Sequence, residues 1–157
     1  MTMKNVILQA VSILALCSLS WQSATAFEAP SDLRIVETDL GPVMTDSEGL
    51  TLYIFDNDTK DKSNCYGKCE KLWPIYLAPE DAQPIGDFKP IDRDDGYKQW
   101  SYKGRPLYTW VKDKAEGDVT GQGFRGTWYV ATPDGEIVKT NAGGSSGAGY
   151  GNGSYER

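Results

Sequence analysis

The chain has 157 residues, a formal net charge of −6 at pH 7 and no histidine. Without histidine it lacks the commonest general base, the commonest metal ligand, and any Ser-His or Cys-His nucleophilic pair. The acidic balance excludes nucleic acid as an expected partner, because no basic patch is present to neutralise phosphates. We therefore expect a protein that is not an enzyme and that holds no metal or cofactor.

The first 26 residues are typical of a secretory signal peptide. Lys4 is the only charge, residues 6–19 form an apolar run, and Ala24-Thr25-Ala26 supplies the small-x-small cleavage pattern. The run is short for a stable membrane span. Residues 14–17 resemble a bacterial lipoprotein box, but the position before Cys17 is Leu and should be small, so lipid anchoring is not expected. We predict a secreted or periplasmic product after cleavage near Ala26.

Strands are expected from residue 33 onward. Residues 33–37 alternate apolar and polar side chains, residues 43–45 follow a turn, and residues 50–55 follow the tight turn Asp46-Ser47-Glu48-Gly49. Large apolar side chains alternate to both faces of the third strand. We therefore expect both of its faces to be covered.

The second half of the chain follows the same plan. Expected strands cover residues 88–91, 97–102 and 106–111, and a C-terminal hairpin joins residues 127–131 to residues 136–139. One long loop follows the third strand of each copy. In the first copy it covers residues 59–72, where a short helix over 66–72 is weakly signalled, and in the second it covers the glycine-rich residues 114–127. Residues 141–157 are Gly- and Ser-rich, with too little apolar surface to offset their ordering entropy, so we expect a disordered tail.

One motif occurs twice, 55 residues apart. Residues 52–58 and 107–113 both read Leu-Tyr-x-aromatic-x-x-Asp, and the same offset superimposes two pairs of glycines and one pair of tryptophans: Gly41 with Gly96, Gly49 with Gly104, and Trp73 with Trp128. A shared offset over this length indicates an internal repeat. We predict an all-β domain over residues 27–140, made of two antiparallel pseudo-repeats (about 33–87 and 88–140) plus the hairpin. The strands could form a meander, a barrel-like closure or two packed sheets, and the motif faces should meet about an approximate twofold axis.

Cys65 and Cys69 are the only cysteines after residue 26. In an oxidising compartment two such thiols form a disulfide, which in so small a loop contributes about 2 kcal/mol. A redox-active pair is the alternative, but it would be Cys-x-x-Cys at a helix start in a βαβ unit. A zinc site needs four ligands, which two cysteines without histidine do not supply. A structural disulfide is the preferred interpretation.

Asp56, Asp58 and Asp61 alternate like the start of a calcium-binding loop. Lys60 stands where that loop needs another oxygen ligand, and no glycine follows it. Of the three carboxylates only Asp58 has a counterpart in the second copy, Asp113. We expect Asp58 and Asp113 to accept hydrogen bonds from loop amides where the strands end.

The repeated aromatic side chains have two interpretations. Large rings pack well on sheets and supply much of the buried area of a small domain, which favours the core. The same rings could line a face that binds a planar or sugar-like ligand. The candidate binding or repeat-motif residues are Tyr53, Phe55, Asp58, Trp73, Tyr108, Trp110, Asp113 and Trp128.

Several stretches in combination resemble a known family. They are residues 52–58, 63–69 and Leu72-Trp73-Pro74 in the first copy, and residues 99–108 and Gly121-Gln122-Gly123 in the second. Together they are similar to bacterial secreted repeat proteins of unknown function, also described as predicted lipoproteins with a Tyr-x-(Phe/Trp/Tyr)-x-x-Asp motif. The resemblance covers about residues 33–135 and implies a bacterial envelope location, with no established activity. Leu16 departs from the lipoprotein signal, so lipid attachment is not carried over.

These observations predict a secreted or periplasmic, non-enzymatic module that binds a small ligand or an envelope partner. The alternative is a periplasmic redox- or metal-handling accessory protein that uses Cys65 and Cys69 or Tyr and Asp oxygens. The two copies differ most in their long loops, one closed by cysteines and one rich in glycine. If the protein has a functional surface, these loops are where we expect it.

Overall fold

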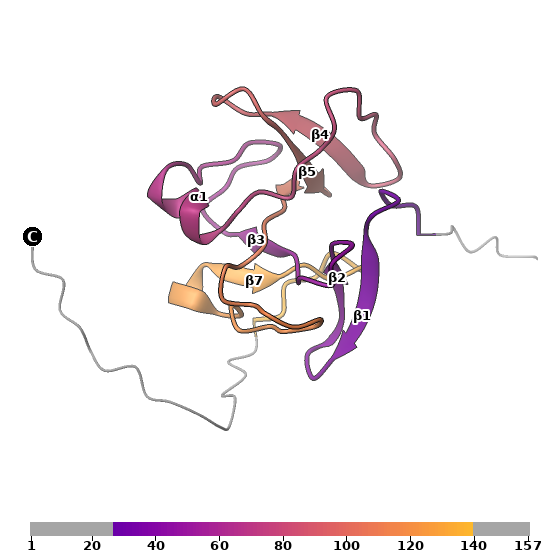
Figure 1. Ribbon diagram of the computed structural model, residues 1–157, viewed down its shortest axis with the longest axis vertical. Coiled ribbons are helices and arrows are strands. Elements are labelled where there is room, and N and C mark those ends of the chain that lie inside the picture. Colours follow the sequence, from indigo (N-terminus) through magenta and orange to yellow (C-terminus); the bar gives the residue numbers. More distant parts are fainter. Residues whose placement is uncertain (1–26, 140–157) are drawn as a thin grey trace, which may run out of the picture.

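The computed structural model describes residues 27–139, so the predicted signal peptide and tail lie outside the described residues. Its strands form three small antiparallel sheets, β1-β2, β3-β7 and β4-β5-β6, without a closed barrel among the described residues (Figure 1). The prediction of an all-β domain is confirmed. The elements are β1 Arg34–Thr38, β2 Gly41–Thr45, β3 Tyr53–Phe55, α1 Lys68–Leu72, β4 Phe88–Asp92, β5 Lys98–Tyr102, β6 Arg105–Pro106, the 3-10 turn η1 Phe124–Gly126 and β7 Trp128–Val130.

Each copy begins with a hairpin, β1-β2 in the first and β4-β5 in the second. In Figure 1 the two hairpins lie apart, with β3 and β7 in the region between β1-β2 and α1. The turns that follow them differ in length, because three residues separate the paired Asp46 and Leu50 but only two separate Tyr102 and Arg105. Lys103 and Gly104 in the shorter turn have φ of 49° and 80°. Two successive positive φ values match the twist of the flanking strands, so a glycine is favoured there.

The two copies are joined where their motifs meet. The amide of Tyr53 donates to the carbonyl of Tyr108 at 2.7 Å, and the amide of Tyr108 donates back at 3.0 Å. Tyr53 also pairs with Val130 in the β3-β7 sheet, and Tyr108 forms the equivalent bridge to Ile75. With the 55-residue offset, Tyr53 corresponds to Tyr108 and Ile75 corresponds to Val130. The two bridges are therefore equivalent contacts made by the two copies. The copies therefore pair about an approximate twofold axis, with each motif strand next to a segment of the other copy.

The C-terminal hairpin is the part of the predicted fold that the structure corrects. Its turn forms, with the amide of Gly135 donating to the carbonyl of Thr132 at 3.0 Å. Residues 136–139 are not a strand, however, and β7 pairs with β3 instead. Pairing with β3 places Val130 in a buried cluster, whereas residues 136–139 are exposed or half-buried. β7 pairs with the distant β3 because this pairing buries more apolar surface than pairing with residues 136–139 would.

The segment that contains β3 separates two buried clusters, as the alternation of residues 50–55 predicts. Leu52 and Ile54 face one cluster and Tyr53 faces the other. The strand itself is shorter than expected, although Thr51 still forms a bridge to Thr45. The first cluster comprises Met44, Leu52, Ile54, Tyr76, Ala78, Phe88, Trp100, Tyr102, Leu107 and Ala131, and the second comprises Val43, Tyr53, Cys65, Trp73, Tyr108, Trp110, Trp128 and Val130.

Candidate functional site

Four of the repeated aromatic rings stack in a row that alternates between the copies. Phe55 stacks on Trp128 (centroids 4.2 Å apart, 13° between planes), Trp128 on Trp73 (3.8 Å, 2°) and Trp73 on Trp110 (4.1 Å, 26°). The 55-residue offset maps Phe55 onto Trp110 and Trp73 onto Trp128, so the twofold passes through the middle of the row. Stacked pairs of this kind contribute about 0.5–1.5 kcal/mol each beyond their buried area. The row, which we call the ring stack, is thus a structural core shared by both copies.

The tyrosine and aspartate of the motif are exchanged between the copies. The hydroxyl of Tyr53 donates to Oδ2 of Asp113 at 2.7 Å, and the hydroxyl of Tyr108 donates to Oδ2 of Asp58, also at 2.7 Å. Each hydroxyl thereby joins one copy to the carboxylate that ends the motif of the other. This exchange accounts for the repeated Tyr-x-aromatic-x-x-Asp spacing.

The second oxygen of each carboxylate holds the loop that follows it. The amide of Asn64 donates to Oδ1 of Asp58 at 2.7 Å, and the amide of Thr120 donates to Oδ1 of Asp113 at 3.1 Å. The predicted hydrogen bonds from loop amides are therefore present at both aspartates. They tie a residue near the middle of each long loop to the aspartate that precedes the loop.

Burial decides the protonation of these pairs. It raises the pKa of Asp58 to about 6, against lowering contributions from the Asn64 amide and the Tyr108 hydroxyl. Burial also raises the pKa of Asp113. The pKa values of Tyr53 and Tyr108 are raised by burial and by the carboxylates they face, so both tyrosines remain hydrogen-bond donors at neutral pH.

A buried arginine that the motif analysis did not single out holds the cysteine loop. The side chain of Arg93 is 0% exposed, and its guanidinium reaches Asp95 at 2.6 Å and Glu70 at 3.0 Å. It also donates to Ser63 Oγ at 2.9 Å and to the carbonyl of Cys65 at 3.2 Å. A buried guanidinium is tolerated only when it is paired in this way. The sequence gives little indication of this role of Arg93, because the partners of its guanidinium come from both copies of the repeat.

The predicted disulfide is present. Cys65 and Cys69 are joined with an S–S distance of 2.02 Å. Cys65 is buried and Cys69 is half-buried. α1 starts at Lys68 directly after Gly67, whose φ of 59° suits a residue without a side chain. The weakly signalled helix of the first loop is thus a single turn closed by the disulfide.

The glycine loop packs against the ring stack. A side chain at Gly121 would lie 2.7 Å from Trp73 and 3.0 Å from Tyr53, so no larger residue fits without movement. The amide of Gly121 donates to the hydroxyl of Tyr53 at 3.2 Å. Glycine here allows the backbone to approach the rings. The glycine-rich loop therefore lies directly on the core.

A groove of about 540 Å³ opens between the two long loops at the Phe55 end of the ring stack. We call it the loop groove. The half-buried Phe55 lines it, whereas Trp110, the counterpart at the other end of the stack, is 3% exposed. The stack is therefore open at one end and covered at the other. The groove is lined from the stack by Phe55, Trp73 and Trp128, from the cysteine loop by Lys68, Cys69 and Leu72, and from the glycine loop by Phe124, Arg125 and Thr127, together with Asn57.

The structure divides the eight predicted site residues. Six are buried, and the half-buried two are Phe55 and Asp58. Three of the eight reach the loop groove, while the Tyr–Asp pairs and Trp110 serve the contact between the copies. The groove residues that the motif missed, among them Lys68, Leu72 and Arg125, belong to the loops by which the copies differ. That difference was the sequence signal for them.

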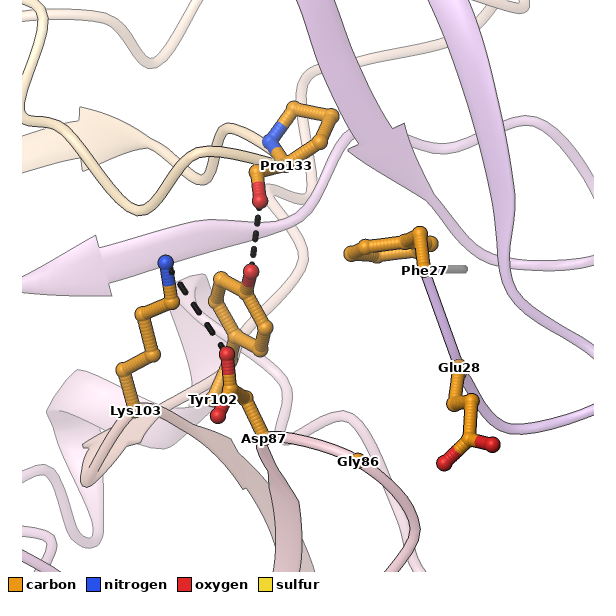
Figure 2. Close-up of a pocket in the computed structure, with 7 residues that line it drawn as sticks. All are labelled: Phe27, Glu28, Gly86, Asp87, Tyr102, Lys103 and Pro133. Atoms are coloured by element: carbon orange, nitrogen blue, oxygen red, sulfur yellow. Dashed lines mark hydrogen bonds and ion pairs between the residues drawn. The ribbon is translucent and has the colours of Figure 1, made fainter. Parts of the chain in front are cut away.

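Two other hollows lie away from the ring stack. One is bounded by Phe27 and Glu28 on one side and by Tyr102 and Lys103 on the other (Figure 2). In it the Tyr102 hydroxyl donates to a backbone carbonyl at 2.5 Å, and Lys103 lies 3.9 Å from Asp87, so these two side chains are already engaged.

The second hollow, of about 750 Å³, is a shallow apolar depression edged by two aspartates: it is lined by Pro30, Asp32, Leu77, Asp81, Ile85 and Trp100, among others. It does not touch either motif. Unlike the loop groove, neither hollow is lined by the two long loops in which the copies differ.

Within residues 27–139 no three or more Cys, Asp or Glu side chains are grouped so that they could hold a metal ion. Across the same residues no helix combines the length and apolarity that crossing a membrane requires.

Comparison with known sequences identifies the repeat. Searches among curated proteins and among solved structures found no match. A family model described as a secreted repeat of unknown function matches residues 34–76 and residues 89–132. The two matches start at β1 and within β4, correspond to the two copies that the structure pairs, and together cover more than half of the 157 residues. The chain belongs to this family of secreted repeats of unknown function.

Proposed function

We propose that this protein is an extracytoplasmic, non-enzymatic binding module whose ligand enters the loop groove and packs on Phe55. The observation that carries the proposal is the open end of the ring stack. Phe55 is half-buried and lines the groove, while its counterpart Trp110 is covered. Concave sites lined by aromatic side chains with a few polar groups are the usual form of small-ligand pockets.

The non-enzymatic character is supported by what the motif does. Tyr53 and Tyr108 each donate to a carboxylate of the other copy, and both aspartates are held by loop amides. The two pairs have the same partners in the same roles, whereas acid–base catalysis needs two groups in different environments. These polar groups are engaged in holding the copies and the loops together.

Export is supported by the family and by the start of the chain. Cleavage near Ala26 would leave Phe27 as the first residue, and its ring packs against Phe88 (5.8 Å) and Tyr102 (6.1 Å). The leucine before Cys17 supports a product without a lipid anchor. We propose a secreted or periplasmic location for the folded domain.

The test uses neutral probes, because it asks only where a ligand binds. Naphthalen-2-ol represents planar ligands and cellobiose represents sugars, and each is titrated into the isotope-labelled protein while indole and amide NMR signals are followed. We expect the shifts to concentrate at Trp128, Thr127 and Phe124. Phe55→Ser should weaken binding, and the matched control Phe27→Ser, which removes an exposed ring elsewhere, should not. Shifts that concentrate around Leu77 and Trp100, or that survive Phe55→Ser, would contradict the proposal.

One observation favours the alternative of disulfide chemistry: Cys69 is half-buried and lines the loop groove. A thiol count on the secreted protein separates the two functions. A structural disulfide leaves no reactive thiol in the native protein and opens only when the protein unfolds. Reversible opening in a glutathione buffer, with the fold retained, would favour the redox function.

A further inference from the structure

The charge of the loop groove is opposite to that of the chain. The whole sequence has 22 Asp and Glu against 16 Lys and Arg. The groove is lined by Lys68 and Arg125 and by no Asp or Glu. Two cations without a carboxylate among the lining residues make this a local reversal of charge.

The two cations of the groove also lack acidic partners elsewhere. Among residues 27–139 no ion pair is recorded for Lys68 or Arg125, and both residues are exposed. By contrast, Arg93 and Arg105 each lie 3.0 Å or less from a carboxylate. The charges of Lys68 and Arg125 are therefore available to a molecule that enters the groove.

Arg125 is held beside the rings by a strained backbone. Its φ of 52° lies in the left-handed region, which costs a residue with a side chain about 1–2 kcal/mol relative to the right-handed form. Glycine would adopt it freely, as the neighbouring Gly123 and Gly126 do with φ of 71° and 68°. The guanidinium lies 5.5 Å from the centroid of the Phe124 ring. Asp61 and Lys103 have similar φ values of 56° and 49°, but among these three residues only Arg125 lines the groove, where this backbone conformation accompanies a cation.

The apolar side of the groove is formed mainly by aromatic rings. Phe55 has one face on Trp128, at 4.2 Å and 13°. The groove also touches Trp128 and Trp73, the next two rings of the ring stack, so a flat apolar ligand that enters it can pack on Phe55 and along the row. Leu72, which is 45% exposed, adds an apolar wall.

We infer that the ligand of the loop groove is a planar organic anion, an inference that rests on the proposed function. Its flat apolar body packs on Phe55 beside the ring stack, and its carboxylate, sulfonate or phosphate group is bound by Arg125 and Lys68. Guanidinium groups bind such anions through paired hydrogen bonds, which makes Arg125 the stronger contact. A neutral sugar would leave both cations unused, and a small inorganic anion would leave the rings unused.

The experiment compares three probes that share one ring system and differ in charge. They are 2-naphthoate, naphthalen-2-ylmethanol and naphthalen-2-ylmethylamine, each titrated into the mature protein with NMR detection at Trp128 and Thr127. We expect 2-naphthoate to bind about tenfold more tightly than the alcohol, and the ammonium compound to bind most weakly. Added salt should weaken the naphthoate complex and leave the alcohol complex nearly unchanged.

Charge variants locate the binding of the anionic group. Lys68→Gln and Arg125→Gln should each weaken 2-naphthoate roughly threefold to tenfold, with Arg125→Gln the larger effect, and should leave the alcohol unaffected. The matched control is Lys71→Gln, which removes a charge from the same helical turn at a position that does not line the groove. A loss with Lys71→Gln equal to that with Lys68→Gln would overturn the specific role of the groove cations.

The outcomes separate this inference from the proposed function. If all three probes bind equally and all lose affinity with Phe55→Ser, the groove binds planar ligands and the anion inference is overturned. If inorganic phosphate displaces 2-naphthoate at the same concentration as benzoate does, the planar part is overturned. If no probe shifts the groove signals, the proposed function itself fails.

Discussion

The hydroxyl of Tyr53 lies 2.7 Å from the carboxylate of Asp113, 60 residues later in the chain and in the other copy of the repeat. Its mate, Tyr108 to Asp58, has the same length. Because each copy completes the polar groups of the other, neither can satisfy its own motif alone. The two copies are therefore one cooperative unit, which agrees with the general behaviour of repeats that bury their surfaces against each other.

Replacing Tyr53 by Phe should destabilise the protein by about 1–3 kcal/mol, because Asp113 is buried and would lose a hydrogen bond. Tyr108→Phe should have a similar effect through Asp58. Chemical denaturation of the single and double variants measures both. Tyr97→Phe, at an exposed position, is the control. A loss of less than about 0.5 kcal/mol in both single variants would show that the exchanged pairs do not hold the copies together.

Asp58 should make stability fall as pH rises from about 4 to 6. Its folded pKa of about 6 exceeds the ordinary value of 3.8, so the folded state binds the proton more tightly across this window. Unfolding at a series of pH values should show a shallower slope for Asp58→Asn than for the wild type. The carboxyls of Asp95, Asp118 and Asp134 have lowered pKa values, so they change the pH dependence of stability only at pH values below this window. An unchanged slope in Asp58→Asn would refute the assignment.

Removing the disulfide in the double variant Cys65→Ser, Cys69→Ser should cost about 2 kcal/mol, since the closed loop is short. The loop should remain near its place, because Arg93 and Asp58 also hold it. Thermal unfolding gives the stability, and the Trp128 indole signal reports the groove. A complete loss of the fold would mean that the disulfide, rather than the buried arginine, organises the loop.

Arg125→Gly should raise stability by up to about 1 kcal/mol while it weakens the binding of 2-naphthoate. Glycine relieves the left-handed backbone, although its freedom in the unfolded chain offsets part of the gain. Arg125→Gln, which keeps the strain, should lose binding without gaining stability. Denaturation and titration of the two variants separate strain from charge. Equal stability of the two would show that position 125 carries no strain.

The sequence by itself determined the features that depend on local pattern or on the repeat. Period-two alternation gave an all-β domain, the offset of 55 gave two copies, and the spacing of Cys65 and Cys69 gave the disulfide. The role of Asp58 and Asp113 as acceptors for loop amides was also predictable, because an aspartate after a strand binds nearby backbone groups.

Only the tertiary structure decided which partners meet across the copies. A local turn favours pairing residues 127–131 with 136–139, yet β3 is the partner of β7 because that pairing buries apolar groups on both faces. Burial likewise made most of the motif rings a core and left Phe55 half open. The gathering of Lys68 and Arg125 around it depends on two loops that are far apart in the chain. Such choices rest on surface buried by the whole fold, which no short stretch of sequence contains.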